Sequence, residues 1–210
     1  HLWSPGVRMG VQPGSWAHRT EWFGPVLAVL RAPDLATAIA WQNAVDYGLT
    51  AGLHALDVAD CQTWIDTVQA GNVYVNRGTT GAVVNRQPFG GWKRSAVGPT
   101  AKAGGEDYVS CLRDWDPAPD GLSHAAVERW WARVGGVARD LAGLAVERNL
   151  VRLRPLPRPV LVRVDADVAD QVLESVRRLS ARTGTRVRLS CDGPGRSGVV
   201  EEPLDRVRSL

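Results

Sequence analysis

NVYVNRGTTGAVVNRQPFGG, residues 72–91, is the stretch of sequence that decides how this chain folds. Its first five residues, 72–76, predict a β-strand, because β-branched and aromatic side chains are typical of strands. A loop that contains Gly, Thr and Pro follows, from Arg77 to Gly91. Loops of this length in compact domains are usually functional or disordered. We interpret this one as functional, because it lies between regular elements.

A strand and a helix are predicted immediately before this stretch. Residues 50–56 indicate a strand, and either Asp57 or Asp60 can cap the helix after it. The apolar residues of this helix recur with helical spacing and are Cys61, Trp64, Ile65 and Val68. Gly71 is expected to end the helix.

The same alternation extends toward the first residues of the chain. The apolar run at 26–30 predicts a strand that is covered on both faces. Asp34 offers an N-cap, and Gly48 is expected to end the helix that follows. Its apolar face contains Leu35, Ala38, Ile39 and Val45. Short strands alternating with amphipathic helices over residues 1–114 predict an α/β fold class.

A break and a helical stretch follow this first region. Residues 115–121 are rich in Pro and Asp and predict the break. The apolar residues beyond it suggest a helix that Gly135 and Gly136 weaken. They are Val127, Trp130, Trp131, Val134, Val137, Ala138, Leu141 and Leu144. We expect their aromatic stripe to be buried, with the two tryptophans forming a docking surface.

The last region resembles a small βαβ unit. A strand is predicted at 160–164, a helix through 168–179 that Gly184 ends, and a strand at 186–189. A two-stranded sheet of this size buries too little surface to be stable alone, so it is expected to need partners. The predicted division is therefore residues 1–114, a helical linker at 115–154, and a partial βαβ domain at 155–210.

Composition restricts the classes of function. The 210 residues are 44% hydrophobic and 22% charged, which is typical of a folded globular protein. The net charge is +3, and the basic residues are scattered and mostly interleaved with acidic ones. This distribution disfavours a nucleic-acid-binding protein. No apolar run is long enough to span a membrane, so a cytoplasmic location is expected. Because the sequence begins at His1 inside a strand-like segment, we expect it to continue a longer protein.

Two segments are candidates for binding small molecules. The first is EWFGPV, residues 21–26. The alternative to a binding role for this segment is a structural turn with one solvated acid. In the long loop, Gly81 and Ala82 precede QPFGG at 87–91, and small residues there allow backbone N–H groups to approach an anion. The alternative for this second segment is an ordinary surface loop.

In this order, the motifs EWFGPV, NVYVNR and QPFGG resemble the aldehyde dehydrogenase superfamily. Within it, residues 76–105 and the opening LWSPGVRMGVQPGS resemble the L-glutamate γ-semialdehyde dehydrogenase part of bifunctional proline utilization A. The resemblance is strong over residues 2–114 and weak from residue 147 onward. It implies the C-terminal portion of an NAD-dependent dehydrogenase catalytic domain and an aldehyde substrate.

The resemblance also implies roles for particular residues. Glu21 matches the acid that accepts hydrogen bonds from the nicotinamide ribose, and Phe23 matches the aromatic near the nicotinamide ring. Gly81 and Ala82 match the loop that holds the substrate's α-carboxylate. Phe89 matches the ring that lines the aliphatic part of the substrate.

The groups that perform the chemistry are not found in this sequence. Family members use a cysteine thiolate as nucleophile and a glutamate to activate water. Cys61 is expected in the core, Cys111 lies past the PFGG motif in YVSCLRDW, and Cys191 belongs to the tail. The base glutamate and the dinucleotide-binding domain are not found either, so we assign no catalytic and no metal-binding residue. The three thiols, odd in number and widely spaced, are expected to stay reduced.

Two interpretations of the function remain open. The chain alone is expected to be inactive and to need the missing N-terminal part of the enzyme as a partner. YVSCLRDW, residues 108–115, resembles a late strand of the family that pairs across subunits, which predicts a homo-oligomer. The rival interpretation is a non-catalytic interaction or regulatory protein that derives from a dehydrogenase. The lone histidines His18 and His54 are interpreted as structural.

Overall fold

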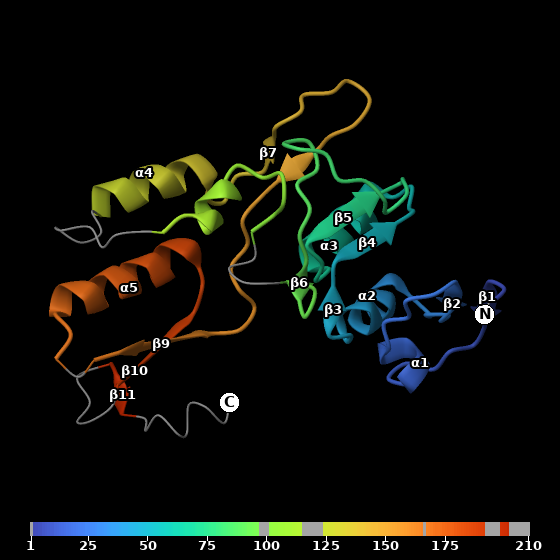
Figure 1. The fold of residues 1–210 in the computed structure, drawn as a ribbon, viewed down its shortest axis with the longest axis horizontal. Coiled ribbons are helices and arrows are strands. Elements are labelled where there is room, and N and C mark those ends of the chain that lie inside the picture. Colours follow the sequence, from blue (N-terminus) through green and yellow to red (C-terminus); the bar gives the residue numbers. More distant parts are fainter. Residues whose placement is uncertain (1, 97–100, 115–123, 166, 192–197, 202–210) are drawn as a thin grey trace. The chain divides into compact units, whose positions relative to one another are not determined.

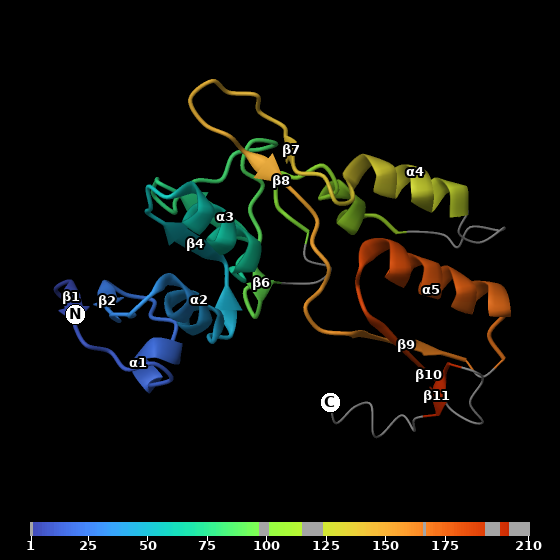
Figure 2. The same ribbon diagram turned by 180° about the vertical axis from the view of Figure 1, so that it is seen from behind.

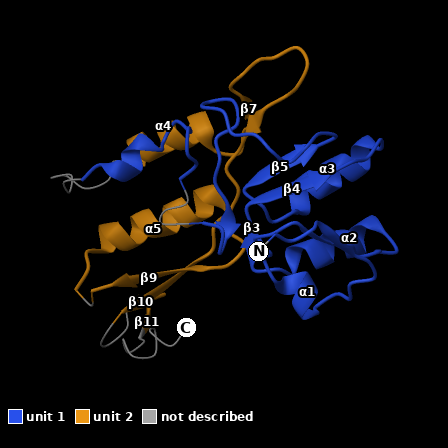
Figure 3. Cartoon of the chain, turned by 45° about the vertical axis from the view of Figure 1, so that its right-hand side comes forward, with its two compact units in different colours: residues 1–114 blue, residues 115–210 orange. Residues whose placement is uncertain are grey.

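The structure is a computed structural model, and it describes residues 2–96, 101–114, 124–165, 167–191 and 198–201. Its internal contacts divide the chain into two compact units, His1–Asp114 and Trp115–Leu210, coloured separately in Figure 3. Each unit is described by itself. The predicted break at residues 115–121 lies outside the described residues.

The first unit alternates strands and helices, as its apolar pattern predicts (Figure 1). Its elements are β1 (Gly6–Arg8), α1 (Trp16–Arg19), β2 (Val26–Ala28), α2 (Leu35–Asn43), β3 (Tyr47–Gly48), β4 (Thr50–Leu53), α3 (Val58–Thr67), β5 (Asn72–Val75), β6 (Trp92–Lys93) and the 3-10 helix η1 (Val109–Leu112). The pairs β1–β2 and β4–β5 are parallel, and β3 pairs antiparallel with β6. The α/β class is confirmed.

The core of the first unit lies where α2 and α3 meet the β4–β5 pair. Its buried members are Ile39, Ala51, Trp64, Val68 and Ala70. Trp64 is 2% exposed, and its indole Nε1 donates to Gln42 Oε1 at 2.9 Å. The apolar face predicted for α3 is therefore the face that packs.

The structure decides which aspartate caps α3. Asp57 Oδ1 accepts hydrogen bonds from the backbone nitrogens of Ala59 at 2.7 Å and Asp60 at 3.0 Å. Asp60 lies in the first turn instead. An N-cap carboxylate satisfies backbone N–H groups that have no partner within the helix.

We expect Asp57→Ala to lower the free energy of unfolding of the first unit by about 1 kcal/mol, the usual cost of an N-cap. Asp60→Ala loses only a charge near the helix N-terminus and should cost about 0.3 to 1 kcal/mol. Urea unfolding followed by circular dichroism measures both. An effect of Asp60→Ala as large as that of Asp57→Ala would contradict the assignment of the cap.

The second unit contains a parallel sheet with a helix against it. Its elements are α4 (His124–Val134), β7 (Arg139–Asp140), β8 (Leu150–Val151), β9 (Val160–Val164), α5 (Asp170–Thr183), β10 (Val187–Cys191) and β11 (Val200–Glu201). The strand order is β11-β10-β9, all parallel. Leu173 of α5 packs on Leu189, Cys191 and Val199, and Figure 2 shows α5 alongside β9 and β10. Gly184, at φ 68°, ends α5 as predicted.

Two expectations for the second unit are corrected. The sheet has three strands rather than two, because β11 adds to β10. The helix predicted through residue 144 ends at Val134, since Gly135 and Gly136 follow and Gly136 adopts φ 67°. The Trp131 ring packs where a side chain on Gly135 would lie, whereas Trp130 is 40% exposed, so the aromatic stripe is only partly buried.

Residues 108–114 are not a strand. Val109–Leu112 form the 3-10 helix, in which Ser110 N donates to Asp107 O and Cys111 N donates to Tyr108 O. A strand obtains its hydrogen bonds from a neighbouring strand. In the described chain this segment satisfies its backbone locally instead. The strand that would pair across subunits is therefore not formed here.

Smaller differences concern the ends and the covering of strands. The strand predicted at 50–56 ends at Leu53, and Gly48 belongs to β3 rather than ending α2. The run at 26–30 forms only the three-residue β2, in which Val26 is 46% and Leu27 58% exposed. That strand is paired along one edge with β1 and is not covered on both faces. Across the described residues, no helix is both long and apolar enough to cross a membrane.

Candidate functional site

Glu21 and Phe23 lie in the segment between α1 and β2. Trp22 fixes this segment, because its ring meets Trp16 edge-on at 4.6 Å and its Nε1 donates to Ala17 O at 3.3 Å. Glu21 is exposed, and Phe23 is 95% exposed. Both predicted cofactor contacts are therefore accessible, although a fully exposed phenylalanine is costly in water.

The loop after β5 is folded on itself. Val83 and Gln87 form an antiparallel bridge around a turn at Asn85, which adopts φ 60°. Tyr74 Oη donates to Gly81 O at 2.9 Å and ties the loop to β5. Gly81 adopts φ 135°, a conformation that L side chains rarely adopt, and a Cβ there would meet the Gln87 side chain at 2.8 Å. The loop therefore requires glycine at this position.

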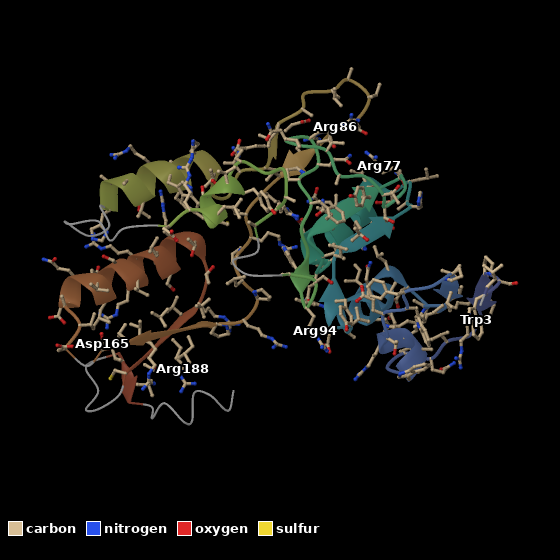
Figure 4. All side chains as sticks on the ribbon, viewed as in Figure 1. Trp3, Arg77, Arg86, Arg94, Asp165 and Arg188 are labelled. Carbon is tan, nitrogen blue, oxygen red and sulfur yellow. The ribbon has the colours of Figure 1, made fainter. Side chains whose placement is uncertain are left out.

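Two arginines belong to the same loop and are labelled in Figure 4. The Arg77 guanidinium lies over the Tyr74 ring at 5.7 Å. One of its nitrogens lies 3.8 Å from the place of a Cβ on Gly81. Gly81 and Ala82 are exposed. Positive charge beside exposed backbone is the arrangement that attracts a carboxylate.

Phe89 is held through its backbone. Phe89 N donates to Ala103 O at 2.9 Å, and Ala103 N donates to Phe89 O at 2.8 Å. Asn72 clamps both neighbours, since its Nδ2 donates to Pro88 O at 3.0 Å and its Oδ1 accepts from Gly90 N at 3.1 Å. The Phe89 side chain is half-buried. The PFGG segment is thus anchored to the start of β5 and to residue 103.

Lys102 is the residue at this site that sequence reasoning missed. Its Nζ donates to Gly71 O at 2.6 Å, Gly90 O at 2.8 Å and Asn72 Oδ1 at 2.9 Å. Burial lowers the pKa of Lys102 to about 8, because a charged ammonium group loses hydration there. The available signal in the sequence was its rarity, since the chain has only two lysines.

The structure does not bring the two predicted groups together. Gly81, Ala82 and Phe89 belong to one folded loop. The segment of Glu21 and Phe23 lies on the far side of β4 and α2 from that loop in Figures 1 and 2. A pocket shared by both groups therefore needs more than the described part of the first unit.

The three cysteines differ in their surroundings, and His18 is held by backbone contacts. Cys191 is in the core of the second unit. The prediction that Cys61 is a core residue is wrong, because Cys61 is only partly buried and its thiol lies 3.8 Å from Ala55 O. Cys111 is exposed on η1. His18 accepts from Gly14 N at 2.9 Å and lies 3.1 Å from Trp41 O. In the described parts of both units, no three His, Cys, Asp or Glu side chains are grouped to hold a metal ion.

The chain is an α/β protein, because its first unit has parallel strand pairs with helices packed against them. An anchored loop that contains glycine follows the second of these pairs. The chain belongs to the aldehyde dehydrogenase family, whose model matches residues 1–113. The resemblance seen in the motifs is thus confirmed.

Two curated relatives of the chain are a PutA protein and a 1-pyrroline-5-carboxylate dehydrogenase. A bifunctional protein PutA from Rhizobium meliloti is 32% identical over 241 residues, which cover 90% of this chain and 19% of that protein. A 1-pyrroline-5-carboxylate dehydrogenase from Geobacillus sp. (strain WCH70) is 40% identical over 105 residues, covering 50% of this chain and 20% of that protein. The chain spans about a fifth of the length of these curated relatives.

Two solved structures also match the chain. Proline utilization A from Corynebacterium freiburgense matches with a TM-score of 0.76 and 38% identity, covering 93% of this chain and 23% of that one. Since the first unit ends at residue 114 of 210, this match includes most of the second unit as well. A 1-pyrroline-5-carboxylate dehydrogenase from Thermus with bound NAD is 40% identical over 51% of this chain and 20% of its own, with a TM-score of 0.49.

Proposed function

We propose that this chain is the C-terminal part of an NAD-dependent dehydrogenase that oxidises L-glutamate γ-semialdehyde to L-glutamate in proline breakdown. The observation that supports this most directly is the anchored loop, in which Gly81 is held by Tyr74 and Phe89 by Ala103. The relatives of the chain include PutA and 1-pyrroline-5-carboxylate dehydrogenases.

The loop residues would recognise the acid end of the substrate. Gly81 and Ala82 would donate backbone N–H groups to the α-carboxylate, with Arg77 supplying positive charge beside them. Phe89 would pack on the aliphatic carbons between the carboxylate and the aldehyde. In this way the loop would orient the aldehyde toward the reacting groups.

The segment before β2 would hold the cofactor. Glu21, a carboxylate that can only accept hydrogen bonds, would bind the nicotinamide ribose hydroxyls, and Phe23 would pack near the ring. NAD, when bound, supplies the acceptor for the hydride. The nucleophilic thiolate would come from another segment, because none of Cys61, Cys111 and Cys191 lies in the loop or in the segment between α1 and β2. The resemblance to the family implies another segment for the water-activating glutamate as well.

A large exposed apolar surface supports the need for a further segment. The apolar side chains of and around β1 and β2 are exposed: Leu2, Trp3, Val7, Met9, Trp16, Phe23, Val26 and Leu27. Exposed apolar side chains that gather on neighbouring elements often mark an interface. We infer that the missing part of the enzyme covers it and completes the pocket. The three-part domain division, the homo-oligomer and the cytoplasmic location remain predictions.

Complementation tests this proposal. The chain is co-expressed with the portion of the Rhizobium meliloti PutA that precedes the matched region, and the complex is purified. We expect NADH to form when L-glutamate γ-semialdehyde and NAD are added, while the chain alone stays inactive. A stable complex that forms no NADH would overturn the enzyme proposal and favour a non-catalytic interaction protein.

Within that complex, Glu21→Ala should weaken NAD binding about tenfold, the effect of losing roughly 1.4 kcal/mol of hydrogen bonding. The matched control is Asp60→Ala, which removes an exposed carboxylate from α3. Titration calorimetry with NAD measures both. Equal affinities for the Glu21 variant and the unmodified complex would remove Glu21 from the cofactor site.

A further inference from the structure

The Lys102 ammonium group lies where three stretches of backbone converge. Its acceptors belong to the turn before β5 (Gly71 O), to β5 itself (Asn72 Oδ1) and to the PFGG segment (Gly90 O). An ammonium group has three N–H donors, so every donor is used. Lys102 therefore holds together segments that are 12 to 31 residues from it in the sequence.

The backbone is packed closely at the same point. A Cβ on Gly71 would overlap Gly90 O, and a Cβ on Gly90 would lie 3.2 Å from Lys102 Cα. Asn72 accepts from both Lys102 Nζ and Gly90 N, which links the ammonium group to the PFGG backbone a second time. The Gly71 and Gly90 carbonyl oxygens both accept from Lys102 Nζ, so the ammonium cation offsets the repulsion between their partial negative charges.

We propose that Lys102 is a positioning residue for the loop at residues 77–91. Its ammonium group holds Gly90 against the start of β5 and thereby sets the position of the Phe89 ring. The role given to Phe89 rests on the proposed function. The hydrogen bonds of Lys102 do not, because they are present in the chain by itself.

Lysine suits this position better than arginine. The acceptors surround a single point, which a compact ammonium group fills, whereas a guanidinium group is planar and wider. The chain contains 25 basic residues, of which only two are lysines. The other, Lys93, uses the same device elsewhere, donating to Asn43 O at 2.7 Å and Val45 O at 2.8 Å. Lys93 is therefore a matched control.

Protonation should control the strength of this contact. A neutral amine has two N–H donors, so at least one of the three acceptors loses its hydrogen bond from Nζ when Lys102 is deprotonated. The groups that face Nζ are Gly71 O, Asn72 Oδ1 and Gly90 O, all uncharged, and the nearest charged residues along its own segment, Glu106 and Asp107, are exposed. The lowered pKa, about 8, has desolvation as its cause.

Nuclear magnetic resonance of the chain tests the contact directly. With the whole chain isotope-labelled, the two lysine Nζ signals are assigned by Lys102→Met and Lys93→Met. We expect the Lys102 signal to titrate near pH 8, with the amide signals of Gly71, Phe89 and Gly90 shifting in parallel. Lys102→Met should abolish that parallel shift and Lys93→Met should leave it. Loop amides that do not follow the titration in the unmodified chain would overturn the proposal, even if Lys102→Met fails to fold.

Kinetics of the complemented enzyme test the consequence for substrate. Lys102→Met and Lys102→Arg should raise KM for the aldehyde about tenfold, because misplaced binding groups lose affinity, while KM for NAD stays unchanged. KM for the aldehyde in the unmodified enzyme should rise above about pH 8. A general loss of stability would reduce the folded fraction, which lowers the apparent kcat and leaves both KM values unchanged. If the unmodified complex is inactive, the proposed function fails and the resonance experiment still decides the role of Lys102.

Discussion

Trp64→Ala should lower the free energy of unfolding of the first unit by about 3 to 5 kcal/mol, the range for deleting a buried aromatic side chain. Trp64 is 2% exposed and lies at the centre of the cluster formed by α2, α3, β4 and β5. The substitution leaves a cavity and removes the donor to Gln42 Oε1. Because the loop at residues 77–91 directly follows β5, it should become disordered together with the core.

The control for this prediction is Trp3→Ala, which removes the same side chain from a position that is 83% exposed. Surface substitutions usually change stability by less than about 0.5 kcal/mol. Urea unfolding, monitored by circular dichroism and by amide hydrogen exchange of α3, measures both variants. Since Leu173 and Leu189 belong to a separate core, their amides should keep their protection in Trp64→Ala. A similar cost for the two tryptophans would mean that the core is placed wrongly.

Gly71→Ala should be the most damaging glycine substitution in the loop region, with a loss of about 1 to 3 kcal/mol from overpacking. The added Cβ would overlap Gly90 O and lie 2.7 Å from Gly91 Cα. Both neighbours are backbone atoms, so a rotamer change cannot relieve the contact. The PFGG segment must move away from β5, which also separates Gly90 O from Lys102.

Gly78→Ala provides the matched control within the same stretch. A Cβ there would approach only Thr80 Oγ1, at 3.8 Å, an ordinary van der Waals contact. Gly78→Ala should therefore change stability by less than about 0.5 kcal/mol. The Lys102 Nζ resonance should shift in Gly71→Ala and stay in place in Gly78→Ala. Identical spectra for the two variants would contradict the close approach at Gly71.

The regular elements with strong local signals were predictable from the sequence. Asp34 caps α2 through Thr37 N at 2.7 Å, and Gly184 ends α5, as the residue types indicate. The strand at Asn72–Val75 and the βαβ order of the second unit also follow their apolar patterns. These features depend on neighbouring residues in the chain, so a local pattern is sufficient to specify them.

The predictions that failed depend on distant partners. Residues 108–114 have the composition of a strand, but no neighbouring strand pairs with them in the described chain, and they form a 3-10 turn. The run at 26–30 is apolar enough for a buried strand, yet Leu27 is 58% exposed. Burial and pairing are properties of the surroundings, which an apolar pattern can only anticipate.

By itself the sequence determined the family, the α/β alternation and the segments that carry the candidate site, because motif order and apolar periodicity are local properties of the chain. Tertiary structure alone decided that Lys102 joins Gly71, Asn72 and Gly90, and that the segment between α1 and β2 lies apart from the loop after β5. Hydrogen bonds to backbone oxygens leave no trace in residue type at the acceptor, so only the folded chain reveals which carbonyls meet the ammonium group.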